Sequence, residues 1–234
     1  DEIKTKYSEA SIILATNMFA HMATIGEVIS GIEHLLKDDG VFVFENHYLL
    51  DVIERGQFDT IYHEHLRTYS LKSIIKLFSY YDFTVTDVER GSRYGGNIRV
   101  HVTKGKNKTV SENVVNLLEL EEKSGLNKLE TYTKFANRVK KAKTDFLNFI
   151  LTAKNGKTIV ANSCPGRSVT LLNYYGIDSE LIPYITEQPS SLKLGMFLPG
   201  KHIPIINNEI LIKDQPDYVI LLAWHYADSI IEQL

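Results

Sequence analysis

The sequence predicts an α/β protein, and three observations support that class. Residues 11–45 contain an apolar run, a segment with helical spacing and a second apolar run, joined by short connections. The same alternation returns from Lys157 onward. Between the two, residues 107–153 place apolar side chains at helical spacing among many lysines and glutamates. Strand–helix–strand order with short joins is typical of a parallel sheet, so we expect a sheet on each side of a helical segment.

The first sheet-containing part is expected to end near residue 105. Apolar residues recur at helical spacing in segment 24–36, and Asp38-Asp39-Gly40 is expected to end that helix, with Gly40 as a left-handed terminator. Ser70 is expected to cap a later helix. The elements expected in chain order are a strand at 11–15, a helix at 24–36, a strand at 40–45, a short helix at 48–54, an extended piece at 60–65, a helix at 70–80, and a hairpin of strands at 83–90 and 97–104.

The remaining sequence predicts a helical connector and a smaller α/β domain. Two helices are expected to meet near Ser124-Gly125. After them we expect a strand at 157–163, a helix at 168–176 ended by Gly176, and strands at 181–187 and 217–224. The predicted regions are therefore 1–105, 106–153 and 154–234. The chain starts in the approach to a strand and stops in the helical pattern DSIIEQL, so we expect it to be a fragment of a longer protein.

Composition excludes several classes of function. The 234 residues are 44% apolar and 24% charged, which is ordinary for a soluble protein with a buried core. The net charge is −3 and no basic arm is present, so we expect no nucleic acid partner. No apolar run reaches the roughly 18 residues that span a bilayer. Cys164 is the single cysteine, which excludes an internal disulfide framework and a cysteine-rich zinc site and fits a cytoplasmic setting.

Asn17 and His21 are the first candidate site residues. They follow the first predicted strand, in the stretch ATNMFAH. In open α/β sheets ligands bind beyond the carboxyl ends of strands, which is where these two side chains are expected. The alternative is a helix-capping asparagine and a surface histidine.

The stretch YHEH at residues 62–65 is the second candidate. If it is extended, His63 and His65 share one face, while Tyr62 and Glu64 share the other. Two histidines on one face could hold a metal, but a metal site needs at least a third protein ligand. A general base needs less, because a histidine near its reference pKa of about 6.5 is half neutral near physiological pH. A plain polar turn remains the third interpretation.

Several motifs together resemble the sugar C-methyltransferase family, which methylates a ring carbon of nucleotide-linked keto-deoxysugars with S-adenosylmethionine. The resemblance covers nearly the whole chain apart from residues 107–153. The motifs that carry it are ATNMFAH, GVFVFENHYLLDVIERGQFDTIYHEHLRTYSL, YGGNIRVHV, LLNYYGI, MFLPGKHIPI and PDYVILLAWHYADSI. The specific signal is a combination: YHEH followed by Tyr-Ser, with the LPGKHIPI stretch far downstream. Either motif alone would not be specific.

The resemblance implies a role for each candidate residue. His65 matches the active-site base of the family, Tyr62 and Glu64 match its partners, and Asn17 and His21 match a second active-site pair. A carbon next to a ketone can lose a proton because the negative charge spreads onto the carbonyl oxygen. A neutral imidazole could take that proton, and a tyrosine or second histidine could donate a hydrogen bond to the enolate oxygen. The active site is expected between the two α/β parts.

The carboxyl half offers weaker candidates for the nucleotide sugar. Residues 164–168 join a strand to a helix, and backbone N–H groups at a helix start attract phosphate, to which Arg167 would add charge. The resemblance implies that the diphosphate of a nucleotide sugar binds here, whereas the alternative is an ordinary strand–helix turn. Lys201 and His202 could likewise face the ligand or belong to a turn.

The sequence also departs from the family pattern. No Gly-rich loop follows the first strand, Gly95-Gly96 comes too late, and the acidic residue that would hold the cofactor ribose is absent. The family carries an amino-terminal zinc module with cysteines, which is missing here, so zinc is expected only outside this chain. Asn46-His47 stands where a smaller, less polar pair is usual, and Arg167-Ser168 where Lys-Gly is more common. The cofactor-binding residues therefore stay unknown.

Two rival functions remain open at this point. One is an O- or N-methyltransferase with the same architecture, whose base would face a hydroxyl or amine. The other is a non-enzymatic, metal-binding module with His63 and His65 as ligands.

Overall fold

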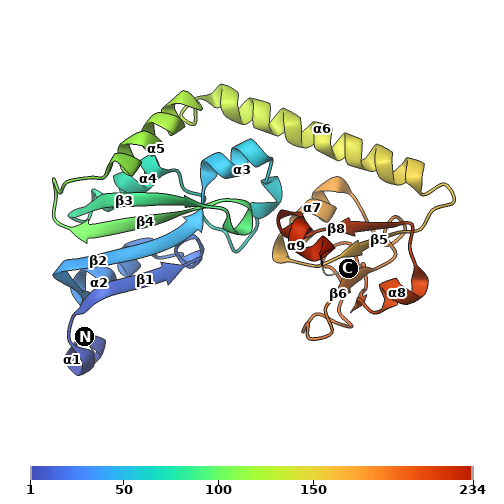
Figure 1. The fold of residues 1–234 in the computed structure, drawn as a ribbon, viewed down its shortest axis with the longest axis horizontal. Coiled ribbons are helices and arrows are strands. Elements are labelled where there is room, and N and C mark those ends of the chain that lie inside the picture. Colours follow the sequence, from blue (N-terminus) through green and yellow to red (C-terminus); the bar gives the residue numbers. More distant parts are fainter. Residues whose placement is uncertain (1, 233–234) are drawn as a thin grey trace. The chain divides into compact units, whose positions relative to one another are not determined.

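The computed structural model describes residues 2–232, which form two compact units (Figure 1). The first unit holds the chain up to Arg55 together with His63–Thr133, and the second holds Gly56–Tyr62 together with the chain from Lys134 onward. Each unit contains one four-stranded sheet with helices, so the predicted α/β class is confirmed. Within residues 2–232 no helix has both the length and the apolar character needed to cross a membrane.

The sheet of the first unit combines a parallel pair with an antiparallel hairpin. Its strand order is β1-β2-β4-β3, where β1 and β2 are parallel and the other two pairs are antiparallel. The predicted strand–helix–strand unit and the predicted hairpin are both confirmed. The elements up to the hairpin are α1 (Glu2–Tyr7), β1 (Ala10–Thr16), the short 3₁₀ helix η1 (Phe19–His21), α2 (Ile25–Leu35), β2 (Leu36–His47), α3 (Leu49–Arg55), the 3₁₀ helix η2 (Phe58–Thr60), α4 (Leu71–Phe78), β3 (Phe83–Gly91), the 3₁₀ helix η3 (Arg93–Gly95) and β4 (Asn97–Lys104).

A cluster of phenylalanines forms the core on one face of this sheet. Phe42 and Phe44 occupy alternate positions of β2 and therefore share a face. Phe19 from η1 packs on Phe44 with ring centroids 4.6 Å apart, and Phe78 from α4 lies 5.7 Å from Phe44. All four side chains are fully buried. This packing holds η1 over the carboxyl end of β2.

The first long helix ends within one residue of its predicted end, but the predicted terminator is wrong. Helix α2 stops at Leu35, Leu36 is already extended, and Gly40 lies inside β2. A Cβ atom on Gly40 would come within 2.8 Å of the Leu36 side chain and 3.1 Å of the Ala10 carbonyl oxygen. Gly40 therefore allows β1 and β2 to approach closely, which is a tertiary requirement that the helix-ending pattern Asp-Asp-Gly imitates in the sequence.

The predicted extended piece at residues 60–65 is also wrong. The 3₁₀ helix η2 ends at Thr60, and the chain then bends and turns at residues 62–64. The residues Asp59 and Thr60 are both 1% exposed, so this segment packs against the protein interior and does not run as a strand along a sheet edge. The alternation of faces expected for YHEH does not apply to a turn.

Ser70 caps α4 as predicted. Its hydroxyl accepts a hydrogen bond from the Ser73 backbone N–H, and the Ser73 hydroxyl accepts one from the Ser70 N–H. This reciprocal capping box satisfies two N–H groups that the helix itself cannot pair. Helix α4 ends at Phe78, before the predicted Tyr80.

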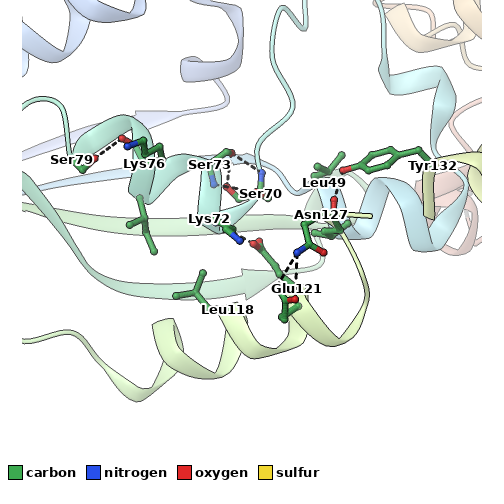
Figure 2. A pocket seen from close by; sticks show the side chains of 13 residues that line it. Leu49, Ser70, Lys72, Ser73, Lys76, Ser79, Leu118, Glu121, Asn127 and Tyr132 are labelled. Carbon is green, nitrogen blue, oxygen red and sulfur yellow. Dashed lines mark hydrogen bonds between the residues drawn. The ribbon is translucent and has the colours of Figure 1, made fainter. Parts of the chain in front are cut away.

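Glu121 on α5 (Glu112–Lys123) secures the start of α4 from the other side (Figure 2). The carboxylate is buried and accepts hydrogen bonds from the Tyr48 hydroxyl, at 2.9 Å, and from the backbone N–H groups of Leu71 and Lys72. A carboxylate near a helix N-terminus is favourable because the helix dipole is positive there. A largely apolar groove lies beside this contact, lined by both helices. Burial and the neighbouring carboxylate raise the pKa of Tyr48, so its hydroxyl stays protonated and donates.

The two helices of segment 107–153 are confirmed, but they do not form a unit of their own. Helix α5 packs on β3 and α4 in the first unit, whereas α6 (Leu129–Ala153) belongs to the second unit from Lys134 onward. The turn between them contains Gly125 at a φ of 68°. The compact units thus divide the chain differently from the predicted ranges, because each helix buries its apolar face against a different sheet.

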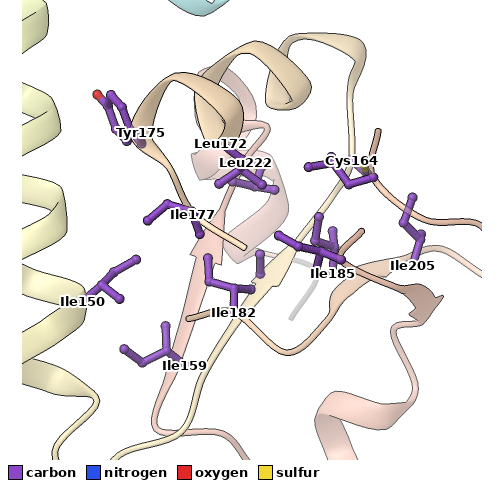
Figure 3. Packing of buried hydrophobic residues seen from close by; sticks show 13 residues of the cluster. Ile150, Ile159, Cys164, Leu172, Tyr175, Ile177, Ile182, Ile185, Ile205 and Leu222 are labelled. Carbon is purple, nitrogen blue, oxygen red and sulfur yellow. The ribbon is translucent and has the colours of Figure 1, made fainter. Parts of the chain in front are cut away.

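The second unit has a fully parallel sheet of order β7-β6-β5-β8. Ile150 from α6 joins its core beside Leu172, Ile182 and Leu222 (Figure 3). Gly176 ends α7 at a φ of 80°, as predicted. Strand β7 was not predicted. The elements are β5 (Ile159–Asn162), α7 (Gly166–Tyr175), β6 (Ile185–Glu187), β7 (Ile205–Asn207), α8 (Ile210–Asp214), β8 (Tyr218–Leu221), the 3₁₀ helix η4 (Trp224–Tyr226) and α9 (Ala227–Ile231).

Candidate active site

Three imidazole rings gather at the carboxyl edge of the first sheet. His21 lies in η1, His47 ends β2, and His65 lies in the loop before α4. The ring centroid of His65 is 4.9 Å from that of His21 and 4.6 Å from that of His47. The ring of Tyr94 from η3 is 5.9 Å from that of His47. We call these four side chains the imidazole cluster.

Asn17 connects β1 to the imidazole cluster. Its backbone N–H donates to the Glu45 carbonyl oxygen at 3.1 Å, and its φ of 52° is left-handed, a conformation that asparagine tolerates better than most residues. The chain leaves the strand here and enters η1. The capping alternative fails, since η1 begins after Met18 and has no side-chain cap. The structure therefore brings Asn17 and His21 to the sheet edge where they were expected.

Glu64 and His63 lie on the exposed turn. The Glu64 carboxylate is 4.0 Å from His63 Nε2, and the His63 side chain is 87% exposed, whereas His65 is half-buried. The role of Glu64 as a partner of His65 stays a prediction. His63 and His65 are not part of the group of possible metal ligands found among the described residues. That group lies on β3 and β4 and consists of Asp87, Glu89 and His101.

Tyr62 belongs to the second unit. A Cβ atom on Gly166 would lie 3.3 Å from its ring, so the ring lies against the first residue of α7. The residues Tyr62 and Glu64, grouped in one motif by the sequence, are thus divided between the two units. The role of Tyr62 as a donor to an enolate stays a prediction.

Arg167 forms a buried ion pair with Asp59. The guanidinium donates to both carboxylate oxygens, at 2.6 and 2.8 Å, and the two side chains are 7% and 2% exposed. The Trp224 indole N–H donates to the same carboxylate at 3.0 Å, and the Trp224 ring also lies 5.1 Å from the guanidinium carbon. We expected Arg167 to offer its charge to a diphosphate; instead that charge is compensated inside the second unit. A contact of Arg167 with substrate remains only a prediction.

His225 extends this network and makes the stability of the second unit depend on pH. Burial, together with the Arg167 guanidinium 3.3 Å from Nδ1, lowers the pKa of His225 to about 4, from an ordinary value of 6.5, against the opposing effect of Asp59. Between these two pH values the unfolded chain binds more protons, so the folded state is expected to lose stability as the pH falls through this window.

Thermal denaturation of wild type and His225→Gln on both sides of pH 6.5 tests this expectation. Carboxylates titrate in the same range in both proteins, so the difference between them isolates the histidine. The variant is expected to show the flatter pH dependence. Parallel curves for the two proteins would contradict the assignment.

Lys201 and His202 lie in a turn. The backbone N–H of His202 donates to the Leu198 carbonyl oxygen at 2.9 Å, and His202 has a left-handed φ of 53° and is exposed. This geometry agrees with the turn alternative. Contact of either side chain with substrate stays a prediction.

His47 and Tyr94 are members of the imidazole cluster that sequence reasoning did not single out. The sequence did carry a signal for His47, because a polar pair, Asn46-His47, ends an otherwise apolar strand. Tyr94 gave none, since it lies in the hairpin connection and takes a left-handed φ of 55° there. Its place beside His47 depends on the antiparallel pairing of His47 with Asn97.

Comparison with known proteins identifies the family to which the chain belongs. The chain is similar to the C-methyltransferase NovU of Streptomyces niveus, with 33% identity over 234 residues that cover 99% of this chain and 56% of that protein. It therefore spans about half the length of this relative. Residues 92–234 match the family described as the C-methyltransferase C-terminal domain. That match covers more than half of the sequence and confirms the family that the motifs predicted: the chain belongs to the C-methyltransferase family.

Proposed function

We propose that this chain forms part of an S-adenosylmethionine-dependent enzyme that methylates a ring carbon next to the ketone of a nucleotide-diphosphate deoxysugar. The observation that carries the proposal is the imidazole cluster, which lies at the carboxyl edge of a sheet in a member of a C-methyltransferase family. Ligands of open α/β sheets bind at that edge. The enzyme's substrate class rests on the sequence resemblance.

The chemistry begins with a proton. His65 accepts the proton from the carbon beside the ketone through a ring nitrogen, and the electron pair left behind spreads onto the carbonyl oxygen. His21, whose ring centroid is 4.9 Å from that of His65, donates a hydrogen bond to the developing oxygen anion. Glu64 and Tyr62 keep the supporting roles that the resemblance implies. Both rings are within reach of one ligand, so the assignment of base and donor is decided by experiment.

The surroundings of the cluster fit a sulfonium-bearing cofactor. The Tyr94 ring lies 5.9 Å from that of His47, and the face of a tyrosine ring attracts cations. S-adenosylmethionine supplies the methyl group when it is bound. The residues of this chain orient the acceptor carbon and handle its proton.

Product analysis tests the proposal and separates it from the O- and N-methyltransferase alternative. The full-length protein is incubated with ¹³C-methyl S-adenosylmethionine and a dTDP-linked 4-keto-6-deoxyhexose. NMR is expected to show a carbon-bound methyl group. An oxygen- or nitrogen-bound methyl group would favour the alternative, and an unmodified sugar would overturn the proposed substrate class.

Solvent exchange tests the proton step separately. In D₂O without methyl donor, the enzyme is expected to exchange the hydrogen on the carbon beside the ketone, because the enolate forms and is reprotonated from solvent. Exchange that stays at the uncatalysed rate, while methylation proceeds normally, would exclude an enolate formed ahead of methyl transfer.

A further inference from the structure

Polar groups without partners are buried at the carboxyl ends of β1 and β2. Within residues 2–232, the Oδ1 atom of Asn17, both amide atoms of Asn46 and the hydroxyl of Tyr69 are buried and lack a hydrogen-bond partner. Asn46 is 1% exposed and Tyr69 is 6% exposed. Buried polar groups are almost always hydrogen-bonded, because an unpaired one destabilises the fold. Three such side chains in one place therefore need an explanation.

Asn17, Asn46 and Tyr69 lie in one region, because each is close to Phe19 in the sequence or through ring packing. Asn17 precedes Phe19 by two residues. Phe44, whose ring centroid is 4.6 Å from that of Phe19, precedes Asn46 by two residues on β2, so the two share a face of the sheet. The Tyr69 ring lies 6.2 Å from that of Phe19.

Backbone pairing fixes the same neighbourhood. Tyr69 pairs with Tyr48 directly after β2, and the Leu49 N–H donates to the Tyr69 carbonyl oxygen at 2.9 Å. His21 follows Phe19 by two residues and belongs to the imidazole cluster. The unpaired groups thus belong to the same sheet edge as the side chains to which the proposed function assigns the chemistry.

The inference rests on the proposed function: we propose that Asn46 and Tyr69 are further substrate-binding residues, whose hydrogen bonds are completed by hydroxyl or carbonyl oxygens of the sugar. Asn46 both donates and accepts, which suits a hydroxyl group. Tyr69 donates to an oxygen, because burial raises the pKa of its hydroxyl and keeps the proton in place. Phenylalanine and leucine would fill these positions without unpaired polar atoms, so the polar side chains serve the ligand and not the fold.

Conservative variants of the full-length enzyme test this inference. Tyr69→Phe and Asn46→Leu are expected to keep or raise the melting temperature, by up to about 4 °C, because an unpaired buried group is removed. Each is expected to lower kcat/KM toward a dTDP-linked 4-keto-6-deoxyhexose by roughly 3- to 10-fold, the effect of losing a neutral hydrogen bond. The opposite signs of the two effects are the signature of a ligand-directed group.

Tyr48→Phe is the matched control. The Tyr48 hydroxyl is buried as well, but it donates to Glu121 at 2.9 Å. This variant is expected to lower the melting temperature and to leave kcat/KM unchanged. Tyr69→Phe, which changes one oxygen atom, keeps the test decisive even if Asn46→Leu misfolds.

The outcomes separate the inference from the proposed function. If Tyr69→Phe keeps full kcat/KM, or loses melting temperature as Tyr48→Phe does, the inference is overturned while the proposed function stands. If the wild-type enzyme methylates no nucleotide sugar, the proposed function fails and the inference fails with it.

Discussion

Replacing Asp59 with asparagine is expected to lower the free energy of unfolding of the second unit by about 3–5 kcal/mol. The reason is that the Arg167 guanidinium would remain buried, at 7% exposure, without its carboxylate. The Trp224 indole N–H would keep only a neutral oxygen as its acceptor. Urea denaturation of the purified chain measures the change, and a loss below about 1 kcal/mol, the range of surface pairs, would contradict the buried ion pair.

Two control variants sharpen that measurement. The double variant Asp59→Leu with Arg167→Met removes both charges and is expected to recover most of the lost stability, because apolar replacements of buried pairs are often neutral. Asp145→Asn breaks a surface pair with Lys141 on α6, of similar length at 2.6 Å but with side chains 59% and 75% exposed. It is expected to cost less than about 1 kcal/mol.

Replacing His65 with asparagine in the full-length enzyme is expected to lower turnover by a factor on the order of 100 or more, since a positioned acid–base group contributes that much. Asparagine preserves polarity and approximate size but cannot accept a proton at neutral pH. Steady-state kinetics with saturating sugar measures the loss, and the exchange experiment in D₂O shows whether the proton step is the one affected. Turnover within a few-fold of wild type would remove His65 as the base.

His63→Asn is the control for His65. His63 lies two residues earlier on the same loop, but its side chain is 87% exposed, and near-normal turnover is expected. Metal analysis of the same variant tests the remaining rival function. Stoichiometric metal in the wild-type protein that is lost in His63→Asn would favour a metal-binding module.

His21→Asn decides between the two candidate bases. If His65 is the base, His21→Asn is expected to slow methylation but to keep measurable solvent exchange, whereas His65→Asn is expected to abolish that exchange. If exchange is abolished in His21→Asn and kept in His65→Asn, the two roles are reversed.

The helices and strands with strong local signals could be predicted from the sequence. Segment 24–36 has helical spacing, Ser70 has the chemistry of a cap, and Gly176 ends a helix in the left-handed conformation. These features depend on neighbours within a few residues, which a sequence displays directly. Asn17 and His21 were likewise found because they follow a strand.

Features that depend on distant partners could not be predicted in this way. Gly40 resembles a helix terminator, yet its role is to admit the Leu36 side chain and the β1 backbone. Residues 60–65 were expected to be extended, but Asp59 just before them pairs with Arg167, which lies 108 residues later in the chain. Neither the approach of β1 to Gly40 nor the pairing of Asp59 with Arg167 can be deduced from the residues next to them in the sequence.

The sequence by itself determined the α/β class and the family and supplied the two candidate bases, because periodicity and motifs are properties of short segments. Only the tertiary structure decided which groups surround these two histidines. The pairing of β2 with β4 and the packing of Phe19 on Phe44 bring His47, Tyr94 and Asn46 to the edge where His21 and His65 meet. Those neighbours come from separate segments, and their proximity arises only when the apolar faces of the sheet and its helices are buried together.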